Sequence, residues 1–371
     1  MKFIVSSSTL SKQLASIGGV IVNNPVVPIL ENFLFEIDGK QLTVTASDLQ
    51  TSVTTGLVVE AQESASIAIP ARILLETLRN LPEQPVTFSI NEGNYSVEIS
   101  SDNGRYRLAG ENATDFPRLQ LMQKGVSVDM DTKALKKMIN QAIVATSNDE
   151  LRPAMNGVYM NFSEDNATFV ATDGHRLVRY IRSDVGVATQ RPIIVPRKTL
   201  SLLNTLLPNE HQTINIAFND SHVHFKLANV SMISRLIDER FPDYENVIPT
   251  NNVNKLTIDR VSFLGSLKRI SIYSNKTTHQ IKLSIAGSEL HVFAEDFDFS
   301  NEANERLSCE YEGDDLEIGF NAKFLIEMLS NLTVAEVEMH FSTPSKAGLI
   351  FPKEKEQDED LLLLIMPVIL K

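Results

Sequence analysis

The sequence predicts an α+β chain of three repeated domains, each with two helices and several antiparallel strands. The first observation is a long repeat, because the Phe-Pro pair at 116–117 returns 125 residues later at 241–242, and a Met-Pro pair follows 125 residues after that, at 366–367. The second is a landmark before a helical run, since IPAR at 69–72 returns as VPRK at 195–198. Unrelated landmarks that share one offset indicate repeated domains.

Each domain opens with a strand and an amphipathic helix, and a second helix follows the landmark. Apolar residues spaced three or four apart, such as Leu10, Leu14 and Ile17, give a helix one buried face. Asp131 or Thr132 can cap the helix that opens the second domain. We expect six helical segments, at 8–19, 71–80, 132–145, 197–207, 259–276 and 321–332.

The rest of each domain alternates between apolar and polar residues with a period of two. Residues 86–90, 214–218 and 337–341 are examples, and they predict antiparallel strands joined by Asx- and Gly-containing turns. The longest apolar run, 361–370, predicts a buried terminal strand. The expected domain boundaries are 1–122, 123–250 and 251–371.

Composition points to a globular protein of a reducing compartment. One cysteine, Cys309, excludes an intramolecular disulfide, and the first residues lack the apolar core of a signal peptide. A membrane helix needs roughly 20 apolar residues, more than the longest run here provides. We therefore expect a cytoplasmic protein that does not bind membranes.

The net charge of −13 is unevenly distributed. The six expected helices carry 13 Lys and Arg but only three acidic residues, so they sum to +10 and the rest of the chain to about −23. If the helices share one surface, that surface is positive and can bind phosphates without reading sequence. A set of helices with merely solvated basic residues is the alternative.

The motif TDGHR at 172–176 raises an enzymatic alternative, a hydrolase or transferase with His175 as general base and Asp173 as its orienting group. A base without a positioned nucleophile is a weak catalytic signal. His222 and His224 share a face of an expected strand, but no third metal ligand is evident. We therefore predict no enzyme activity, no cofactor and no metal.

Several segments resemble the bacterial DNA polymerase III beta subunit family, the sliding clamps. The resemblance covers the full chain and its three-part repeat, and together the motifs are highly specific. The matching segments are MKF at 1–3, PILEN at 28–32, TDGHRL at 172–177, VPRK at 195–198, RFPDY at 240–244 and MPVIL at 366–370.

This resemblance implies a head-to-tail homodimer, a six-domain ring with helices lining the hole and sheets outside. It implies a processivity factor that encircles double-stranded DNA and tethers DNA polymerase III, other polymerases, and replication and repair proteins carrying short clamp-binding peptides. A clamp loader complex would act in trans. An acidic scaffold protein that does not encircle DNA is the alternative.

The resemblance also implies two sets of site residues, and the charges of the expected helices give a third. The peptide cleft would use Met155, Thr172, Gly174, His175, Arg176, Leu177, Pro242, Val247, Met366, Pro367, Val368, Ile369 and Leu370. The subunit interface would join Tyr106 and Leu108 to Ile272 and Tyr273, which could otherwise be ordinary core. The helix charges give the DNA-facing candidates Lys12, Arg72, Arg79, Lys133, Lys136, Lys137, Arg197, Lys198, Lys268, Arg269 and Lys323. Asn246 and Thr278 depart from the family pattern of Arg and an aromatic residue at these positions, so the cleft rim is expected to differ.

Overall fold

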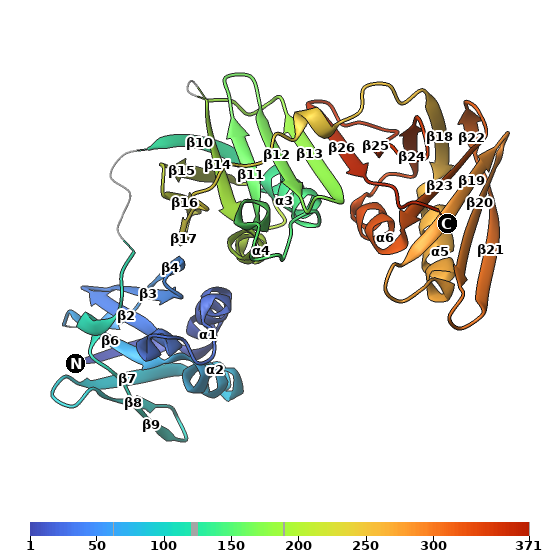
Figure 1. Cartoon of the computed structure of the whole chain (residues 1–371). Coiled ribbons are helices and arrows are strands. Elements are labelled where there is room, and N and C mark those ends of the chain that lie inside the picture. The colour runs from blue at the N-terminus through green and yellow to red at the C-terminus, as the bar shows by residue number, and fades with distance from the viewer. Residues whose placement is uncertain (62, 120–124, 188–189, 371) are drawn as a thin grey trace. The chain divides into compact units, whose positions relative to one another are not determined.

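The computed structural model describes residues 1–61, 63–119, 125–187 and 190–370 (Figure 1). Within these residues six α-helices form, two in each repeat, close to the expected positions. Ser6, Asp131 and Asp259 each accept a hydrogen bond from the backbone amide three residues on, at 3.2, 2.9 and 2.7 Å. Each bond satisfies a donor that the first helical turn leaves free. The helices are α1 (Ser7–Ile17), α2 (Ala71–Asn80), α3 (Thr132–Ile143), α4 (Arg197–Leu206), α5 (Arg260–Ile270) and α6 (Ala322–Asn331).

The prediction of a helix over 259–276 is wrong at its C-terminal end. The α-helix α5 ends at Ile270, and a 3-10 turn, η6 (Ser271–Tyr273), follows it. The Ser271 hydroxyl donates to the Lys268 carbonyl at 3.0 Å, and the Ser274 amide bonds the Ser271 carbonyl at 3.3 Å. These local bonds tighten the last turn and stop the helix.

The chain forms two compact units, and the first comprises Met1–Ala134 and Lys198–Leu236. It holds a five-stranded and an eight-stranded antiparallel sheet. In order across the sheet, the five strands are β5 (Glu60–Ala61), β1 (Lys2–Ser6), β7 (Pro85–Asn91), β8 (Ser96–Ser100) and β9 (Arg105–Ala109). The eight are β10 (Val126–Asp131), β15 (Thr213–Phe218), β16 (His222–Lys226), β17 (Val230–Arg235), β4 (Thr51–Val58), β3 (Gln41–Ser47), β2 (Asn32–Asp38) and β6 (Ala65–Pro70).

The second unit comprises Leu135–Arg197 and Ile237–Lys371. It holds a nine-stranded and a four-stranded antiparallel sheet. The nine strands are β14 (Arg191–Pro196), β11 (Gly157–Phe162), β12 (Ala167–Thr172), β13 (Arg176–Arg182), β26 (Glu359–Ile365), β25 (Gly348–Pro352), β24 (Glu336–Phe341), β18 (Asn254–Asp259) and β22 (Glu310–Glu312). The four are β21 (Asn301–Ser308), β20 (Glu289–Asp296), β19 (Gln280–Ala286) and β23 (Leu316–Asn321).

Two of these sheets run continuously from one repeat into the next. In the first unit β4 pairs with β17, with Thr51 opposite Ser234. In the second unit β13 pairs with β26, with Arg176 opposite Ile365, and the two strands lie side by side in Figure 1. Both pairings are antiparallel, so the backbone groups at each junction between repeats are satisfied by a regular ladder.

The apolar run at 361–370 is only half strand. Residues Leu361 to Ile365 in β26 are buried, whereas the strand ends there and Ile369 is 87% exposed. The expectation of one buried strand over the whole run is therefore wrong for its second half. The expected domain boundary at 122–123 lies outside the described residues. No helix in the described parts is long and apolar enough to cross a membrane.

Candidate peptide-binding site and subunit edges

The turn between β12 and β13 is held by the Asp173 side chain. Asp173 Oδ1 accepts the backbone amides of His175 at 2.9 Å and Arg176 at 3.0 Å. Thr172 Oγ1 accepts the Gly174 amide at 3.1 Å and donates to the Arg176 carbonyl at 2.8 Å. Gly174 has φ +88°, a conformation that favours glycine. The Asp173 carboxylate thus fixes the backbone, and the bonds it makes are not those of a group orienting the His175 imidazole.

Arg176 joins this turn to helix α6. Its side chain is 8% exposed, and it contacts Asp173 Oδ2 at 3.0 Å and Glu327 Oε2 at 2.6 Å. The guanidinium lies 4.6 Å from the centroid of the Phe324 ring, and the His175 ring stacks on the same ring at 6.0 Å. A buried cation with two carboxylates and an aromatic face is well compensated. The turn is therefore fixed relative to α6.

Phe324 and Glu327 contact two of the expected cleft residues, His175 and Arg176, but the sequence did not predict their place beside the turn. The sequence pattern placed Phe324 with Leu325 and Met328 as apolar positions of the second helix, but Phe324 is only half-buried and carries His175 and Arg176 on its ring. The buried face of α6 is complete with Leu325, Met328 and Leu329. That surplus of apolar residues is the signal that could have identified Phe324.

We expect Arg176→Met to lower the free energy of unfolding by about 2 kcal/mol, because charged hydrogen bonds to two carboxylates are removed. Arg72→Met is the matched control, since the Arg72 side chain is 84% exposed in its ion pair with Glu76. It is expected to cost less than about 0.5 kcal/mol. Urea unfolding measures both variants, and equal losses would contradict the buried role of Arg176.

The C-terminal segment continues from β26 across both the turn and strand β23. The Met366 amide donates to the His175 carbonyl at 2.8 Å, and the Val368 amide donates to the Gly319 carbonyl at 2.9 Å. A Cβ on Gly319 would lie 2.7 Å from the Val368 carbonyl oxygen, so only glycine permits this approach. The backbone of this segment is thus fixed while Met366 and Ile369 stay exposed, at 40% and 87%.

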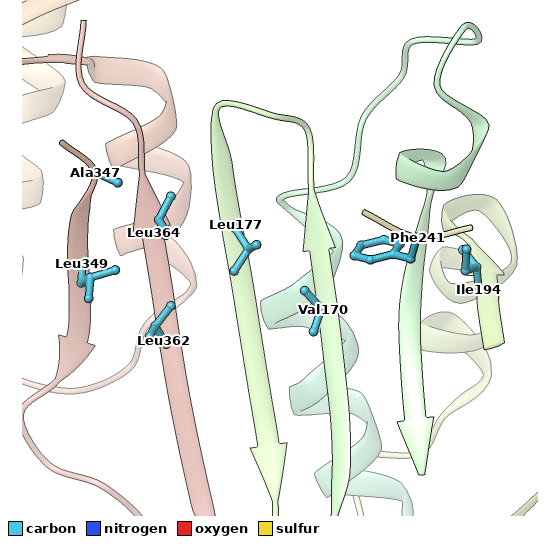
Figure 2. Close-up of a cluster of buried hydrophobic side chains, with 8 residues drawn as sticks. All are labelled: Val170, Leu177, Ile194, Phe241, Ala347, Leu349, Leu362 and Leu364. Carbon is cyan, nitrogen blue, oxygen red and sulfur yellow. The ribbon is translucent and has the colours of Figure 1, made fainter. Parts of the chain in front are cut away.

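An apolar cluster spans the β13–β26 pairing (Figure 2). Figure 2 shows Leu177 on β13 beside Leu362 and Leu364 on β26, with Val170 on the neighbouring strand. The rings of Tyr159, Tyr244 and Phe351 pack against the cluster and are half-buried. The eight members are Val170, Leu177, Ile194, Phe241, Ala347, Leu349, Leu362 and Leu364.

Three further expected cleft residues are neighbours in the sequence of residues that belong to this cluster or pack against it. Pro242 follows Phe241, and the 54%-exposed Val247 precedes Ile248, which packs on the cluster. Met155 is half-buried beside Ala154 in the 3-10 turn η4 (Pro153–Asn156). Leu177 is 1% exposed, so its side chain lies beneath the surface of the expected cleft and is not itself open to a partner. Burial and the nearby Glu245 carboxylate raise the pKa of Tyr244 to about 12, so its phenol stays neutral.

The departures from the family pattern have visible consequences at the rim. The Asn246 amide donates to Asp243 Oδ2 at 2.6 Å, so this short side chain turns to its own loop. Thr278 lines a separate cavity of about 380 Å³ with Phe293, Phe297 and Leu370. Leu370 of the C-terminal segment therefore shares this cavity with a polar threonine, at a position where the family pattern has an aromatic ring.

Beside the turn lies a larger cavity of about 710 Å³. Its walls include His175, Arg176 and Phe324, together with Arg152 and Arg197. Arg152 pairs with Asp149 at 3.4 Å, and Arg197 donates to Asn148 at 2.8 Å. The two histidines of β16, His222 and His224, form hydrogen bonds with Ser221 and Ser231. Burial lowers the pKa of each histidine. Among the described residues, no group of three or more His, Cys, Asp or Glu is placed to hold a metal ion.

The basic helix residues differ in their exposure, and several of them, exposed as well as half-buried, bind carboxylates of the same chain. Lys137 is half-buried between Glu356 at 2.8 Å and Glu359 at 2.7 Å. Arg269 binds Glu305 through two nitrogens, both at 2.7 Å, and Lys198 pairs with Asp48. Lys136 and Arg197 are also half-buried. The exposed candidates are Lys12, Arg72, Arg79, Lys133, Lys198, Lys268, Arg269 and Lys323.

The four expected interface residues lie on or near sheet edges. Tyr106 and Leu108 are on β9, the outer strand of its sheet, with Tyr106 37% and Leu108 8% exposed. Ile272 and Tyr273 in η6 are 63% and 44% exposed. Three of the four are thus surface residues, and only Leu108 belongs to the core of its own domain.

Comparison with known proteins identifies relatives over the full length. Models of the DNA polymerase III beta subunit match the N-terminal domain at residues 1–120, the central domain at 129–243 and the C-terminal domain at 245–369. The beta sliding clamp of Vibrio cholerae is 29% identical over 370 residues, covering 99% of this chain and 100% of the relative. That of Staphylococcus aureus is 28% identical, covering 99% of both chains.

Solved structures that resemble this chain over its full length are sliding clamps as well. The DNA polymerase III subunit beta of Pseudomonas aeruginosa superposes with a TM-score of 0.95 at 27% identity, over 100% of both chains. A sliding clamp of Bartonella birtlesii, solved bound to griselimycin, gives 0.93 at 29% identity, again over 100% of both chains. Three clamp domains in sequence, each with helices and antiparallel sheets, place this chain in the DNA polymerase III beta subunit family, the bacterial sliding clamps.

Proposed function

We propose that this chain is a DNA sliding clamp and that two copies join head to tail into a closed six-domain ring around duplex DNA. The sheet topology is the observation that carries the proposal. Within the chain β4 pairs with β17 and β13 pairs with β26. Strand β21 is the equivalent of β4 and β13 in the third repeat, and β9 is the equivalent of β17 and β26 in the first. Both are outer strands of their sheets in the described structure, so they are left to pair between copies.

The side chains on these two edges support their pairing. Strand β9 carries Arg105 and Arg107, whereas β21 carries Glu302, Glu305 and Arg306, of which Glu305 is bound by Arg269 of the same chain. Opposite charges favour the pairing of β9 with β21 over the pairing of two identical edges. Tyr106 from β9 and Ile272 and Tyr273 from η6 add exposed apolar surface. Two unlike edges on one chain make a head-to-tail contact that closes after two copies in this proposal.

The proposed domains are 1–122, 123–250 and 251–371, with helices lining the hole. The exposed basic residues of the helices then face DNA, while the acidic remainder of the chain lies outside. Phosphate contacts of this kind release counterions and are sequence-independent and salt-sensitive. Topological linkage replaces tight binding, so weak contacts suffice.

The proposed partner site is the apolar cluster with the turn at 172–177 and the tail at 366–370. It suits a short peptide with a glutamine and bulky apolar side chains, presented by DNA polymerase III, other polymerases, the clamp loader and repair proteins. A few buried apolar anchors carry most of the affinity of such a contact. No chemical step is required of the chain, and an ATP-driven loader must open the closed ring in trans.

Retention on circular DNA tests encirclement. The clamp is loaded onto a nicked plasmid with a clamp loader complex and ATP, and bound protein is separated by gel filtration before and after a single restriction cut. A ring stays on the circle and leaves the linear ends, and bulky blocks at both ends restore retention. Equal retention on circular and linear DNA would contradict encirclement. The scaffold alternative predicts no retention on either, and the comparisons give it no support.

We expect Lys133→Ala and Lys137→Ala to act on different properties. Lys133 is exposed on α3, so its removal lowers the salt slope of binding to a short duplex by about one for each phosphate that is no longer neutralised. Lys137 is held by Glu356 and Glu359, and the Glu359 side chain is 8% exposed. Its removal is expected to leave the salt slope unchanged and lower the free energy of unfolding by about 2 kcal/mol. The opposite pattern would show that Lys137 faces DNA.

A further inference from the structure

The hairpin loop before β21 differs from its two counterparts in length and chemistry. In the first repeat two residues, Leu49 and Gln50, separate Asp48 from Thr51, whose backbones pair at 3.0 Å. In the second repeat two residues again separate Asp173 from Arg176, paired at 3.3 Å. In the third repeat Asp296 pairs with Asn301, so the loop has four residues, Phe297, Asp298, Phe299 and Ser300. Phe297 and Phe299 are 78% and 72% exposed.

At both short hairpins, residues in or beside the loop contact the start of a helix in the following repeat. Asp48 pairs with Lys198, and Thr51 Oγ1 lies 3.3 Å from Thr199 Oγ1 on α4. In the second junction His175 stacks on Phe324 of α6 at 6.0 Å. Thr199 and Phe324 are each the third residue of their helix. The third residue of α2 is Ile73, a 53%-exposed apolar side chain.

The register of the third junction follows from the first two. The Arg235 amide bonds the Gln50 carbonyl, and the Met366 amide bonds the His175 carbonyl, so Ser234 and Ile365 are equivalent. In the first repeat the Gly110 amide bonds the Tyr95 carbonyl, and in the second repeat the Leu236 amide bonds the Ser221 carbonyl. These bonds make Gly110 and Leu236 equivalent, so Leu108 and Ser234, each two residues earlier, are equivalent as well.

Because Thr51 pairs with Ser234 and Arg176 with Ile365, Asn301 is expected opposite Leu108 of a second copy. This register sets Glu302 opposite Arg107 of the second copy, an attractive cross-strand pair. A shift that sets Arg107 opposite Asn301 gives no charged cross-strand pair. The opposite shift sets Arg107 opposite Ala303 and Arg105 opposite Glu305, a carboxylate that Arg269 of the same chain already binds. The register therefore follows from the chain's own junctions, and the Arg107–Glu302 pair is compatible with it.

We infer that Ile73 of one copy packs against Phe297 and Phe299 of the next, as a second apolar contact at each junction of the ring. This inference rests on the proposed ring. It adds to the proposed ring a contact between α2 of one copy and the four-residue hairpin loop of the other. Aromatic rings bury large areas, and aromatic side chains are enriched among residues that dominate interface energy. An apolar contact is also insensitive to ionic screening, unlike the Arg107–Glu302 pair.

Cysteine cross-linking separates this inference from the ring itself. In a Cys309→Ser background, Arg107→Cys with Glu302→Cys tests the strand register, since directly opposed Cα atoms suit a disulfide. Ile73→Cys with Phe299→Cys tests the apolar contact. Both pairs are expected to give covalent dimers after mild oxidation. A dimer from the strand pair alone would overturn the Ile73 contact and leave the ring in place. Failure of both pairs would overturn the ring closure as well.

A double-mutant cycle gives a second measurement without new cysteines. Ile73→Ala and Phe299→Ala are each expected to weaken dimerisation about tenfold, as interface anchors do, and the double variant is expected to lose less than the product. Val26→Ala is the control, since Val26 is 96% exposed in the same unit as Ile73 and is expected to change nothing. Effects that multiply, or no effect from either variant, would overturn the contact.

Discussion

Removal of residues 366–371 is expected to abolish binding of a clamp-binding peptide while leaving the dimer intact. The deletion removes the Met366 and Val368 amides that bond the His175 and Gly319 carbonyls, and with them the side chains beside the apolar cluster. Removal of several anchors at once is expected to weaken binding by at least about a hundredfold. Fluorescence anisotropy with a labelled peptide that carries one glutamine and bulky apolar residues measures this change.

A point variant separates the side chains of the tail from its backbone structure. Ile369→Ala keeps every backbone bond of the segment and truncates a side chain that is 87% exposed. We expect it to weaken the same peptide about tenfold, with an unchanged unfolding curve. If the truncated chain binds the peptide as tightly as the full chain does, the assignment of the tail to the cleft is wrong.

Tyr106→Asp is expected to convert the dimer to monomer at micromolar concentration. The substitution buries an unpaired carboxylate in each of the two junctions, at a cost of several kcal/mol in each. Because Tyr106 is 37% exposed in the single chain, the domain itself should fold normally. Sedimentation velocity reports the mass, and the same sample is expected to lose retention on nicked circular DNA.

The matched control for this variant lies on the same five-stranded sheet. Ile4 on β1 is also 37% exposed, but β1 is an inner strand flanked by β5 and β7. Ile4→Asp is therefore expected to remain dimeric. A Tyr106→Asp variant that stays dimeric would contradict closure through β9, and a monomeric Ile4→Asp would indicate a general loss of structure.

The repeat, the six helices and the family could be predicted from the sequence because their signals are local and recur three times. The structure confirms a helix near each expected position, and the comparisons confirm the family. Helix ends were less predictable, because Ile272 and Tyr273 continue the apolar spacing of α5 although serine bonds stop it at Ile270. The second half of the run at 361–370 was also mispredicted, because its residues are apolar like those of β26 although the strand ends at Ile365 and Ile369 is exposed.

Interactions between distant segments could not be predicted from one sequence. Lys137 reads as a solvated helix lysine, yet its carboxylate partners Glu356 and Glu359 lie more than 200 residues away. Phe324 reads as core, yet it supports a turn from the previous repeat. The position of β9 and β21 as outer strands of their sheets becomes visible only when the strand pairings are known.

Imaging the purified protein tests the central claim most directly. Negative-stain electron microscopy at micromolar concentration, combined with a mass measurement, reports architecture and stoichiometry together. The proposed pairing of β9 with β21 predicts a six-lobed ring with a central hole and the mass of two chains. A compact monomer without a hole would contradict the ring, and with it the topological mechanism of DNA retention.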